Sequence, residues 1–246
     1  GLAVATWPVA YGGLDLKPAV ARAVEAVLAP YNLGRLNPLG LNLAAPALFA
    51  YGTEEQRLRF LPPMVRNEEV WCQLFSEPDA GSDLAGLRTS AVKDGKDWVI
   101  NGQKIWSTGA HFSDFGMIVT RTDPNAAKHA GLTYFIVDMK APGVEIRPIK
   151  QINGASGFNT VFFSDVRVPD SNRLGSVGDG WRVAITTLMN ERVAIGAGGG
   201  AGRFRDLLKL ARETKRNGRA AIEDSSVRQK LADFYIRSKG LQYTGY

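Results

Sequence analysis

A polar run in the first half of the chain contains the groups from which a binding loop could be built. It reads Gln73-Leu74-Phe75-Ser76-Glu77-Pro78-Asp79-Ala80-Gly81-Ser82-Asp83. Because Gly81 can adopt a positive φ, the backbone amides of such a loop can point at an anion or at the edge of a heterocycle. Ser82 or Asp83 would cap the segment that follows. An ordinary capped loop between a strand and a turn explains the same residues, so both interpretations stay open.

Residues 104–109 form a second run, Lys-Ile-Trp-Ser-Thr-Gly. Trp106 offers a planar face on which a ring could stack, and the Thr108 hydroxyl could donate to a ring nitrogen. The alternative is a strand tryptophan packed in the core, which is the usual fate of such a side chain.

Glu191 is the candidate general base. On a helix it shares a face with Thr187, Leu188, Ala194 and Ile195, so that its carboxylate projects from an otherwise apolar surface. Burial raises the pKa of a carboxyl group from its reference of about 4.3 towards neutrality, where a general base is most effective. The alternative is a structural ion pair with an arginine on another helix.

Composition excludes several classes of protein. With 246 residues, 45% of them hydrophobic and 22% charged, the chain can bury a sizeable core and is not disordered. No run approaches the roughly 20 apolar residues of a membrane span. Cys72 is the single cysteine, which excludes an internal disulfide and fits a reducing compartment. Neither His111 nor His129 has a partner at metal-ligand spacing, so we expect no metal.

The formal charge is +6, and part of it lies on one predicted helix face formed by Arg205, Lys209, Arg212 and Arg216. Such a stripe is usually a solvated surface. Two sharper interpretations are contact with the phosphates of a small molecule and nucleic-acid binding, which would fall steeply with added salt. We do not expect nucleic acid as a partner.

Hydrophobic periodicity predicts helices at the start of the chain. Helical spacing covers residues 17–28 and 41–50. Thr53 and Gln56 have the spacing of a capping box, for a helix that should end at the Pro-Pro pair at 62–63.

From Trp71 the period shortens to two, which is typical of strands. Asn101-Gly102 lies between alternating runs and predicts a hairpin turn. Further strands are expected over residues 115–120, 132–138, 144–147 and 160–168. We expect an antiparallel, barrel-like sheet.

Helical spacing returns at Gly180 with a long, nearly all-apolar helix. A second helix is expected over residues 204–216, and a third from about Asp224 to the end of the chain at Tyr246.

The predicted fold class is therefore α+β and multi-domain. It comprises a partial N-terminal helical domain over residues 1–70, a middle β-domain over 71–172 and a partial C-terminal helical bundle over 173–246. A ligand would bind in the cleft between the helices and the sheet.

Several of these segments together resemble the acyl-CoA dehydrogenase family. QLFSEPDAGSD with the following LAGLRT, and NGQKIWSTGAHFSD, are similar to its two flavin-contacting segments. ATWPVAYGG, TEEQRLRFLPP and MNERVAIG match the same family in the same order. The resemblance implies a helical domain, a β-domain and a four-helix domain, and against that architecture we expect the chain to be truncated at both ends.

The resemblance also implies FAD as the cofactor and assigns roles by motif. Phe75 and Ser76 would meet the flavin edge, and Gly81 and Ser82 would lie near the FAD pyrophosphate and the acyl-CoA entrance. Trp106 would flank the isoalloxazine, and Thr108 would bond to flavin N5. The complete set of implied cofactor-binding residues is Gln73, Phe75, Ser76, Gly81, Ser82, Trp106, Ser107 and Thr108.

The implied reaction is α,β-dehydrogenation of an acyl-CoA thioester in lipid metabolism. In the isovaleryl-CoA and long-chain branches the base occupies the position of Glu191, whereas other branches place it beyond the position of Tyr246. Arg192 would lie near the thioester, and Ser82 and Leu188 would contact substrate. The implied partners are an acyl-CoA, an electron-transfer flavoprotein and further copies of the chain in a tetramer or dimer. We expect a cytoplasmic protein.

One motif departs from the family pattern. Many members carry Arg-x-x-x-Phe-Gly after the base-bearing helix, where it reaches the FAD of a neighbouring subunit, whereas residues 212–219 here read RETKRNGR. A flavin oxidase or monooxygenase of the same fold, and a catalytically degenerate relative that binds FAD, CoA or DNA, are the alternatives to a dehydrogenase.

Overall fold

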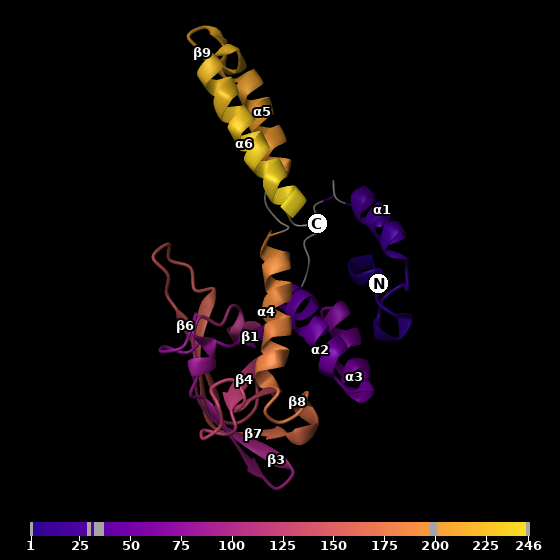
Figure 1. The fold of residues 1–246 in the computed structure, drawn as a ribbon, viewed down its shortest axis with the longest axis vertical. Coiled ribbons are helices and arrows are strands. Elements are labelled where there is room, and N and C mark those ends of the chain that lie inside the picture. Colours follow the sequence, from indigo (N-terminus) through magenta and orange to yellow (C-terminus); the bar gives the residue numbers. More distant parts are fainter. Residues whose placement is uncertain (1, 29–30, 32–36, 197–200, 245–246) are drawn as a thin grey trace. The chain divides into compact units, whose positions relative to one another are not determined.

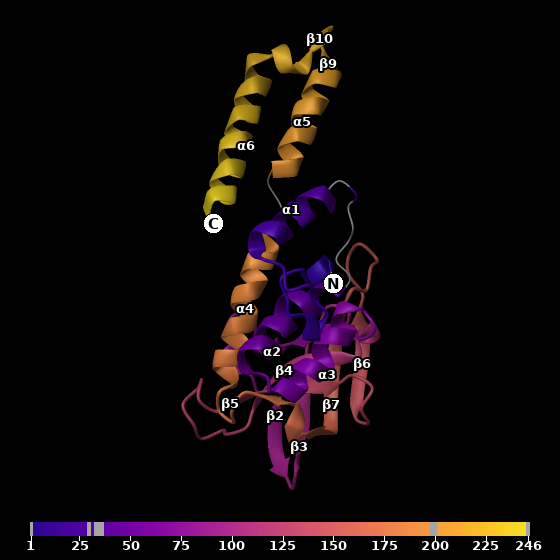
Figure 2. The same ribbon diagram turned by 90° about the vertical axis from the view of Figure 1, so that its right-hand side faces the viewer.

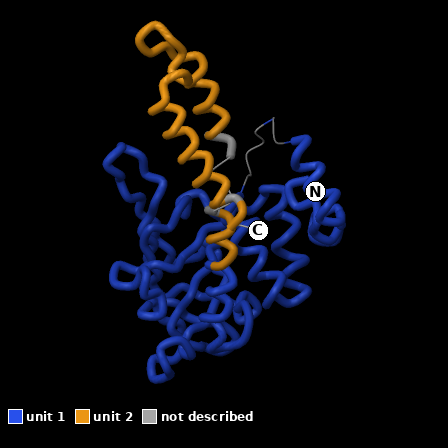
Figure 3. Tube along the Cα trace, turned by 45° about the horizontal axis from the view of Figure 1, so that its top comes forward, with its two compact units in different colours: residues 1–188 blue, residues 189–246 orange. Residues whose placement is uncertain are grey.

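The fold was analysed in a computed structural model that describes residues 2–28, 31, 37–196 and 201–244. The chain divides into two compact units, residues 1–188 and residues 189–246, with helix α4 (Gly180–Gly196) running from one into the other (Figure 3). The predicted end of the last helix at Tyr246 lies outside the described residues.

Helices form the beginning of the first unit, as the periodicity predicts. They are α1 (Pro18–Leu28), the π-helical turn η4 (Gly40–Ala44), α2 (Ala45–Tyr51) and α3 (Glu54–Val65). The capping box is confirmed, because the Gln56 amide donates to Thr53 Oγ1 at 3.2 Å and the Thr53 amide donates to Gln56 Oε1 at 2.9 Å.

Helix α3 does not stop at its proline pair, so the predicted helix end was wrong. Pro62 and Pro63 lie inside the helix, which continues to Val65. Two backbone donors are lost there, but Leu61 and Met64 on either side of the prolines are fully buried. Their packing holds the last turn in place, so tertiary contacts override the local signal.

The middle of the chain forms one sheet with the strand order β6-β7-β3-β2-β4-β5-β8, and β1 pairs with β4 off this path (Figure 1). Its strands are β1 (Trp71–Leu74), β2 (Ser90–Asp94), β3 (Asp97–Lys104), β4 (Phe115–Arg121), β5 (Leu132–Asp138), β6 (Val144–Ile149), β7 (Phe158–Pro169) and β8 (Arg173–Leu174). The expected strands are all present.

The sheet differs from the prediction in two respects. It is mixed rather than purely antiparallel, because β1 and β2 both pair with β4 in parallel. Its described strands also form an open path rather than a closed barrel. Periodicity locates strands but does not say which of them are neighbours, so neither feature was accessible from the sequence.

The predicted Asn101-Gly102 hairpin is also wrong. β3 runs straight through this dipeptide, where its pairing with β7 shifts register between Ile100 and Gly102. Gly102 has φ +148°, and a Cβ atom there would lie 2.7 Å from Thr89 Cα. Gly102 therefore allows a β-bulge and the close approach of the neighbouring segment at Thr89. The turn from β2 to β3 is instead formed around Gly95, with φ +59°.

Alternating side chains of β4 and β5 divide the core between the two faces of the sheet. Met117, Val119, Tyr134 and Ile136 point to one side and pack with buried residues of α2 and α3. Ile118, Phe135 and Val137 point to the other side and pack with residues of β3 and β7. Because both faces are covered, β5 is apolar along almost its whole length.

The second unit contains a helical hairpin. α5 (Ala201–Glu213) and α6 (Ser225–Thr244) lie side by side (Figure 2), and the rings of Phe204 and Tyr235 are 4.8 Å apart. α5 ends before the predicted residue 216, because β9 (Lys215–Arg216) pairs with β10 (Arg219–Ala220).

Asn217 and Gly218 form the turn between β9 and β10, with φ of 51° and 79°. These values suit a tight hairpin turn, for which Asn-Gly is the preferred pair. The departure from the family motif that was noted in the sequence therefore forms a specific structure, a short β-hairpin between two helices. Among the residues that the structure covers, no helix is long and apolar enough to cross a membrane.

Candidate functional site

The two runs singled out in the sequence lie next to each other. The loop after β1 begins with Phe75, which is buried and packs edge-on against Tyr134 with ring centroids 5.9 Å apart. The Ile105 amide donates to the Ser76 carbonyl at 2.8 Å, and Lys104 Nζ donates to the Phe75 carbonyl at 3.1 Å. Hydrogen bonds thus fix the start of the first run against the start of the second.

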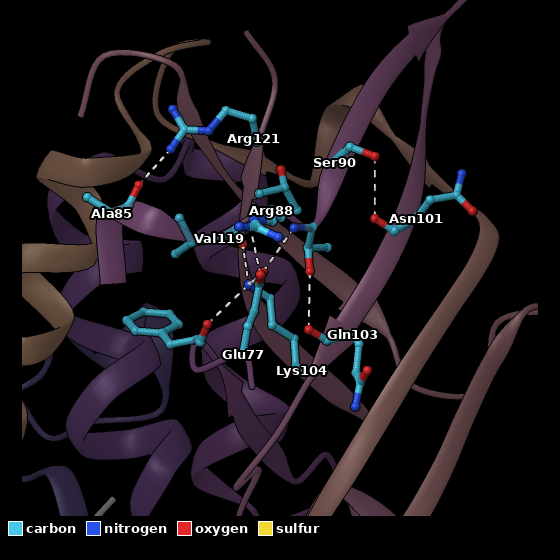
Figure 4. Close-up of polar contacts among 12 residues, drawn as sticks. Glu77, Ala85, Arg88, Ser90, Asn101, Gln103, Lys104, Val119 and Arg121 are labelled. Carbon is cyan, nitrogen blue, oxygen red and sulfur yellow. Dashed lines mark hydrogen bonds and ion pairs between the residues drawn. The ribbon is translucent and has the colours of Figure 1, made fainter. Parts of the chain in front are cut away.

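A buried ion pair, Lys104 with Glu77, lies at this junction (Figure 4). The ammonium is fully buried and donates to Glu77 Oε1 at 2.8 Å and to the Val119 carbonyl at 2.9 Å, in addition to Phe75. Burial lowers the pKa of Lys104 to about 8, against the opposing attraction of Glu77.

The Glu77 carboxylate also closes the loop of which it is part. It accepts hydrogen bonds from the backbone amides of Arg88 at 2.7 Å and Thr89 at 3.0 Å. Burial raises the pKa of this carboxyl, but Lys104 and the two amides outweigh it and hold the pKa below the ordinary value. Both residues lie in the runs singled out from the sequence, but their pairing was not predicted. The available signal is a charged residue beside apolar strand residues in each run, Glu77 just after β1 and Lys104 at the end of β3.

Trp106 is exposed rather than packed in the core, so the core alternative is wrong. The residue is 57% exposed, and its ring lies edge-on to that of Phe158, with centroids 6.1 Å apart. Its φ is +60°, a left-handed conformation that is unusual for a bulky residue and that accumulates at functional sites.

Ser107 and Thr108 continue this segment in opposite environments. Ser107 is buried, and its backbone exchanges two hydrogen bonds with Asn159, at 3.0 and 3.1 Å. Thr108 is exposed, as Trp106 is. A fixed buried residue therefore separates an exposed indole ring from an exposed hydroxyl.

Gly81 and Ser82 are exposed, and neither backbone amide donates a hydrogen bond to a described residue. Gly81 does not adopt the positive φ that was considered for it, and a Cβ atom there would meet nothing within 4 Å. Asp83 does not cap the following turn as considered; its carboxylate pairs with Lys128 Nζ at 2.5 Å.

The remaining predicted site residues lie on β1 and α4. Gln73 is partly buried in β1, opposite Met117. Leu188 packs against the core of the first unit. Glu191 and Arg192 belong to the second unit, where Glu191 is partly exposed and Arg192 Nη1 lies 3.7 Å from Met189 Sδ. The roles of these residues stay predictions.

The residues of the first unit fit FAD. An exposed indole face and a neighbouring hydroxyl suit a planar ring with a polar edge, and the open amides at Gly81 and Ser82 suit a diphosphate. Ser107 Oγ is buried and has no hydrogen-bond partner among the described residues. This hydroxyl is therefore available to bond to a ligand.

The ligand was expected to bind in a cleft between the helices and the sheet, but the predicted FAD-binding residues do not line the cleft found there. A cleft of about 700 Å³ is lined by α3 and by the segment that joins β7 to β8, including Gln56, Arg59 and Asp170. None of the predicted FAD-binding residues lines it. The chemistry of the exposed indole and the open amides, and not the size of a cleft, therefore identifies the candidate site.

The smaller candidates have structural explanations. His111 Nδ1 lies 3.1 Å from Asn159 Oδ1, and the His129 ring stacks on Trp181 at 4.6 Å. Cys72 is fully buried, which raises the pKa of its thiol to about 12. In the described part of the chain, no three His, Cys, Asp or Glu side chains are placed to hold a metal ion.

The basic stripe is shorter than predicted. Arg216 lies on β9 rather than on α5, and its Nη1 is 3.1 Å from Asp224 Oδ2. Lys209 Nζ lies 3.9 Å from Glu213 Oε1. Two of the four cations therefore have acidic partners within their own unit.

Models of known families match almost the whole chain. The acyl-CoA dehydrogenase N-terminal, middle and C-terminal domains match residues 1–68, 72–166 and 178–246. The matches follow one another in the order expected from the sequence, and the helical, β and helical segments of the structure correspond to them.

Curated relatives and solved structures agree. Acyl-CoA dehydrogenase FadE34 of Mycobacterium tuberculosis is 48% identical over 211 residues, 85% of this chain and 30% of that protein. Acyl-CoA dehydrogenase IpdE1 of Mycobacterium tuberculosis is 43% identical over 235 residues, 94% of this chain and 60% of that protein. The structure of the Tcur3481-Tcur3483 steroid ACAD superposes with a TM-score of 0.84 at 33% identity, covering 99% of this chain and 62% of that one.

The chain thus spans less than two thirds of the length of these relatives. Three findings lead to one conclusion: the family models follow one another from residue 1 to residue 246, the relatives have high sequence identity, and the three-part fold is shared. The chain belongs to the acyl-CoA dehydrogenase family.

Proposed function

We propose that this chain is part of an FAD-dependent dehydrogenase that converts an acyl-CoA thioester to the trans-2-enoyl-CoA. The observation that supports this most strongly is the exposed pair of Trp106 and Thr108, in a segment whose start is hydrogen-bonded to the start of the loop that carries the open amides of Gly81 and Ser82. Family membership supports the same cofactor and the same reaction class.

The protein's contribution to this reaction is binding and orientation. FAD, when bound, supplies the acceptor for a hydride. Trp106 would flank its ring system and Thr108 would donate a hydrogen bond to the accepting nitrogen. Phe75 and Ser76 would meet the ring edge from the other segment, and the amides of Gly81 and Ser82 would bind the pyrophosphate.

Glu191 is the proposed base. Its carboxylate removes the proton from the α-carbon of the thioester and becomes neutral, while a hydride leaves the β-carbon and a double bond forms between the two carbons. Arg192 and Leu188, on the same helix, would contact the thioester and the acyl group. General base catalysis of this kind contributes about 10²- to 10⁴-fold to a rate.

The substrate class is an acyl-CoA, with an acyl group to be found by experiment among straight, branched and ring-bearing chains. A steroid ACAD among the structures similar to this chain supports the inclusion of steroid side-chain thioesters. We further propose that an electron-transfer flavoprotein accepts the electrons, that the protein forms a homotetramer or homodimer, and that it works in the cytoplasm.

Anaerobic mixing of the full-length protein with a panel of acyl-CoA thioesters tests this function. Bleaching of the flavin absorbance by at least one thioester is expected, with the matching enoyl-CoA as product. Absence of bleaching by every straight, branched and steroid side-chain thioester, in protein that retains FAD, would contradict a dehydrogenase. Rapid reoxidation of the bleached flavin when oxygen is then admitted would instead indicate the oxidase alternative.

A further inference from the structure

One ammonium group joins three segments of the first unit that are far apart in the sequence. Lys104 Nζ uses all three of its N–H donors, on the Phe75 carbonyl, the Glu77 carboxylate and the Val119 carbonyl of β4, at 2.8 to 3.1 Å. Figure 4 shows the labelled side chains of Glu77 and Lys104 meeting beside Val119. The lysine side chain is fully buried, and only 8% of the Glu77 side chain is exposed.

Stability alone does not explain this pair. Removing two charges from water is costly, and well-packed apolar residues of similar volume in place of a buried ion pair are often as stable or more stable. The lowered pKa of Lys104 expresses that cost. What an apolar pair could not supply is direction, because each of the three donors fixes one specific oxygen atom.

Two of those oxygens, on Phe75 and Glu77, belong to the first proposed flavin-binding segment, and Lys104 leads directly into the second. Trp106 and Thr108 follow Lys104 by two and four residues, and Phe75 is itself one of the acceptors. Glu77 then ties the far end of the loop back through the amides of Arg88 and Thr89. The loop that presents Gly81 and Ser82 is thereby closed at both ends by the same carboxylate.

We propose that Lys104 and Glu77 are positioning residues that set the distance and angle between the two flavin-binding segments. This rests on the proposed FAD site, and neither residue is assigned a contact with flavin. Their effect is to hold the indole ring and the open amides in the arrangement that FAD requires before FAD arrives.

The test separates positioning from stability. In the full-length protein, Lys104→Met, Glu77→Gln and the double variant are compared with wild type, and Arg147→Gln is the control, since Arg147 forms an exposed pair with Glu145 at 2.7 Å. Two quantities are measured for each: the free energy of unfolding of the apoprotein, from urea denaturation, and the dissociation constant for FAD, from titration of the apoprotein.

Each single variant leaves one buried charge unpaired and is expected to lose both stability and affinity. The double variant removes both charges and is expected to recover most of the stability, yet to bind FAD about tenfold or more weakly than wild type, equivalent to about 1.4 kcal/mol. The bound flavin should also show a changed visible spectrum. The control should match wild type in both measurements.

A double variant that binds FAD with wild-type affinity would overturn the proposal, even if the single variants are unstable. Recovery of stability with a persistent loss of affinity would support it. If the wild-type protein itself binds no FAD, the proposed function fails along with this inference, and that outcome is visible before any variant is measured.

Discussion

The hydroxyl groups of Tyr134 and Thr187 lie 3.2 Å apart and are fully buried, so a hydrogen bond joins strand β5 to helix α4 inside the core of the first unit. Tyr134 also packs against Phe75, the first residue of the proposed flavin loop. Burial raises the pKa of the Tyr134 phenol, which keeps it a neutral donor or acceptor.

Thr187→Val is expected to reduce the free energy of unfolding by about 1 to 2 kcal/mol, because it leaves the buried Tyr134 hydroxyl without its partner. Tyr134→Phe should cost about 1 kcal/mol, because the Thr187 hydroxyl keeps a longer contact of 3.5 Å with the Val183 carbonyl. The double variant should lose less than the sum of the two, since both partners are then gone. Urea denaturation of the three variants measures this coupling. Strictly additive losses would show that the two hydroxyls do not interact.

Trp106→Asn should separate stability from binding at one residue. Asparagine tolerates a left-handed backbone much better than tryptophan does, so the apoprotein should be as stable as wild type or more stable by up to about 1 kcal/mol. Affinity for FAD should fall about tenfold or more with the loss of the indole face. Val92→Thr, at an exposed residue of β2 outside both proposed flavin-binding segments, is the control and should leave both unchanged; unchanged affinity in Trp106→Asn would remove Trp106 from the site.

Lys104 predicts an alkaline transition in FAD affinity. The ammonium faces Glu77 as its titratable partner and the Phe75 and Val119 carbonyls, which do not titrate. As the pH rises through about 8, Lys104 loses its proton while Glu77 stays ionised, so one donor disappears and affinity should weaken.

Stability should respond in the opposite direction to the same titration. Between the folded pKa of about 8 and the ordinary value of 10.5, the unfolded chain binds more protons at this residue than the folded chain does. The contribution of Lys104 to the unfolding free energy therefore rises with pH over that interval. FAD titrations at pH 7 to 9 should show the transition in wild type and not in Lys104→Met; the same transition in both would exclude Lys104 as its origin.

Asp170 predicts a loss of stability in acid. Arg173 and the Trp98 indole N–H, the latter at 2.6 Å, hold the pKa of this carboxyl well below its usual range. Because the folded pKa is lowered, the contribution is complete above about pH 4 and is lost as the pH falls further.

Asp170→Asn should therefore cost about 1 kcal/mol at pH 7, a modest figure because the side chain is 37% exposed and solvent screens its ion pairs. The gap between variant and wild type should narrow below pH 4, as measured by urea midpoints. Glu145→Gln, at an exposed pair, provides the comparison. A gap that is constant with pH would show that the Asp170 charge contributes nothing.

Much of the secondary structure could be predicted because its signals are local. The Thr53 capping box and the apolar run of β5 each depend on residues close in sequence. The predictions that failed depended on tertiary context: burial of Leu61 and Met64 carries α3 through two prolines, and the approach of Thr89 turns Asn101-Gly102 from a hairpin turn into a bulge.

The site shows the same division. Motifs identified Trp106 and Thr108, but no propensity predicts the positive φ of Trp106. The pairing of Glu77 with Lys104 was missed because the two are 27 residues apart and meet only when the loop after β1 folds against the end of β3. Buried pairs of this kind require the topology of the sheet, which periodicity does not contain.

The most direct test of the proposed reaction is stopped-flow reduction of the bound flavin by the most effective acyl-CoA, in wild type and in Glu191→Gln. Glu213→Gln, on α5 of the same unit, is the matched control. We expect wild type and control to bleach at the same rate, and Glu191→Gln to retain FAD but bleach at least about 10²-fold more slowly. Reduction of Glu191→Gln at the wild-type rate would contradict the assignment of Glu191 as the base.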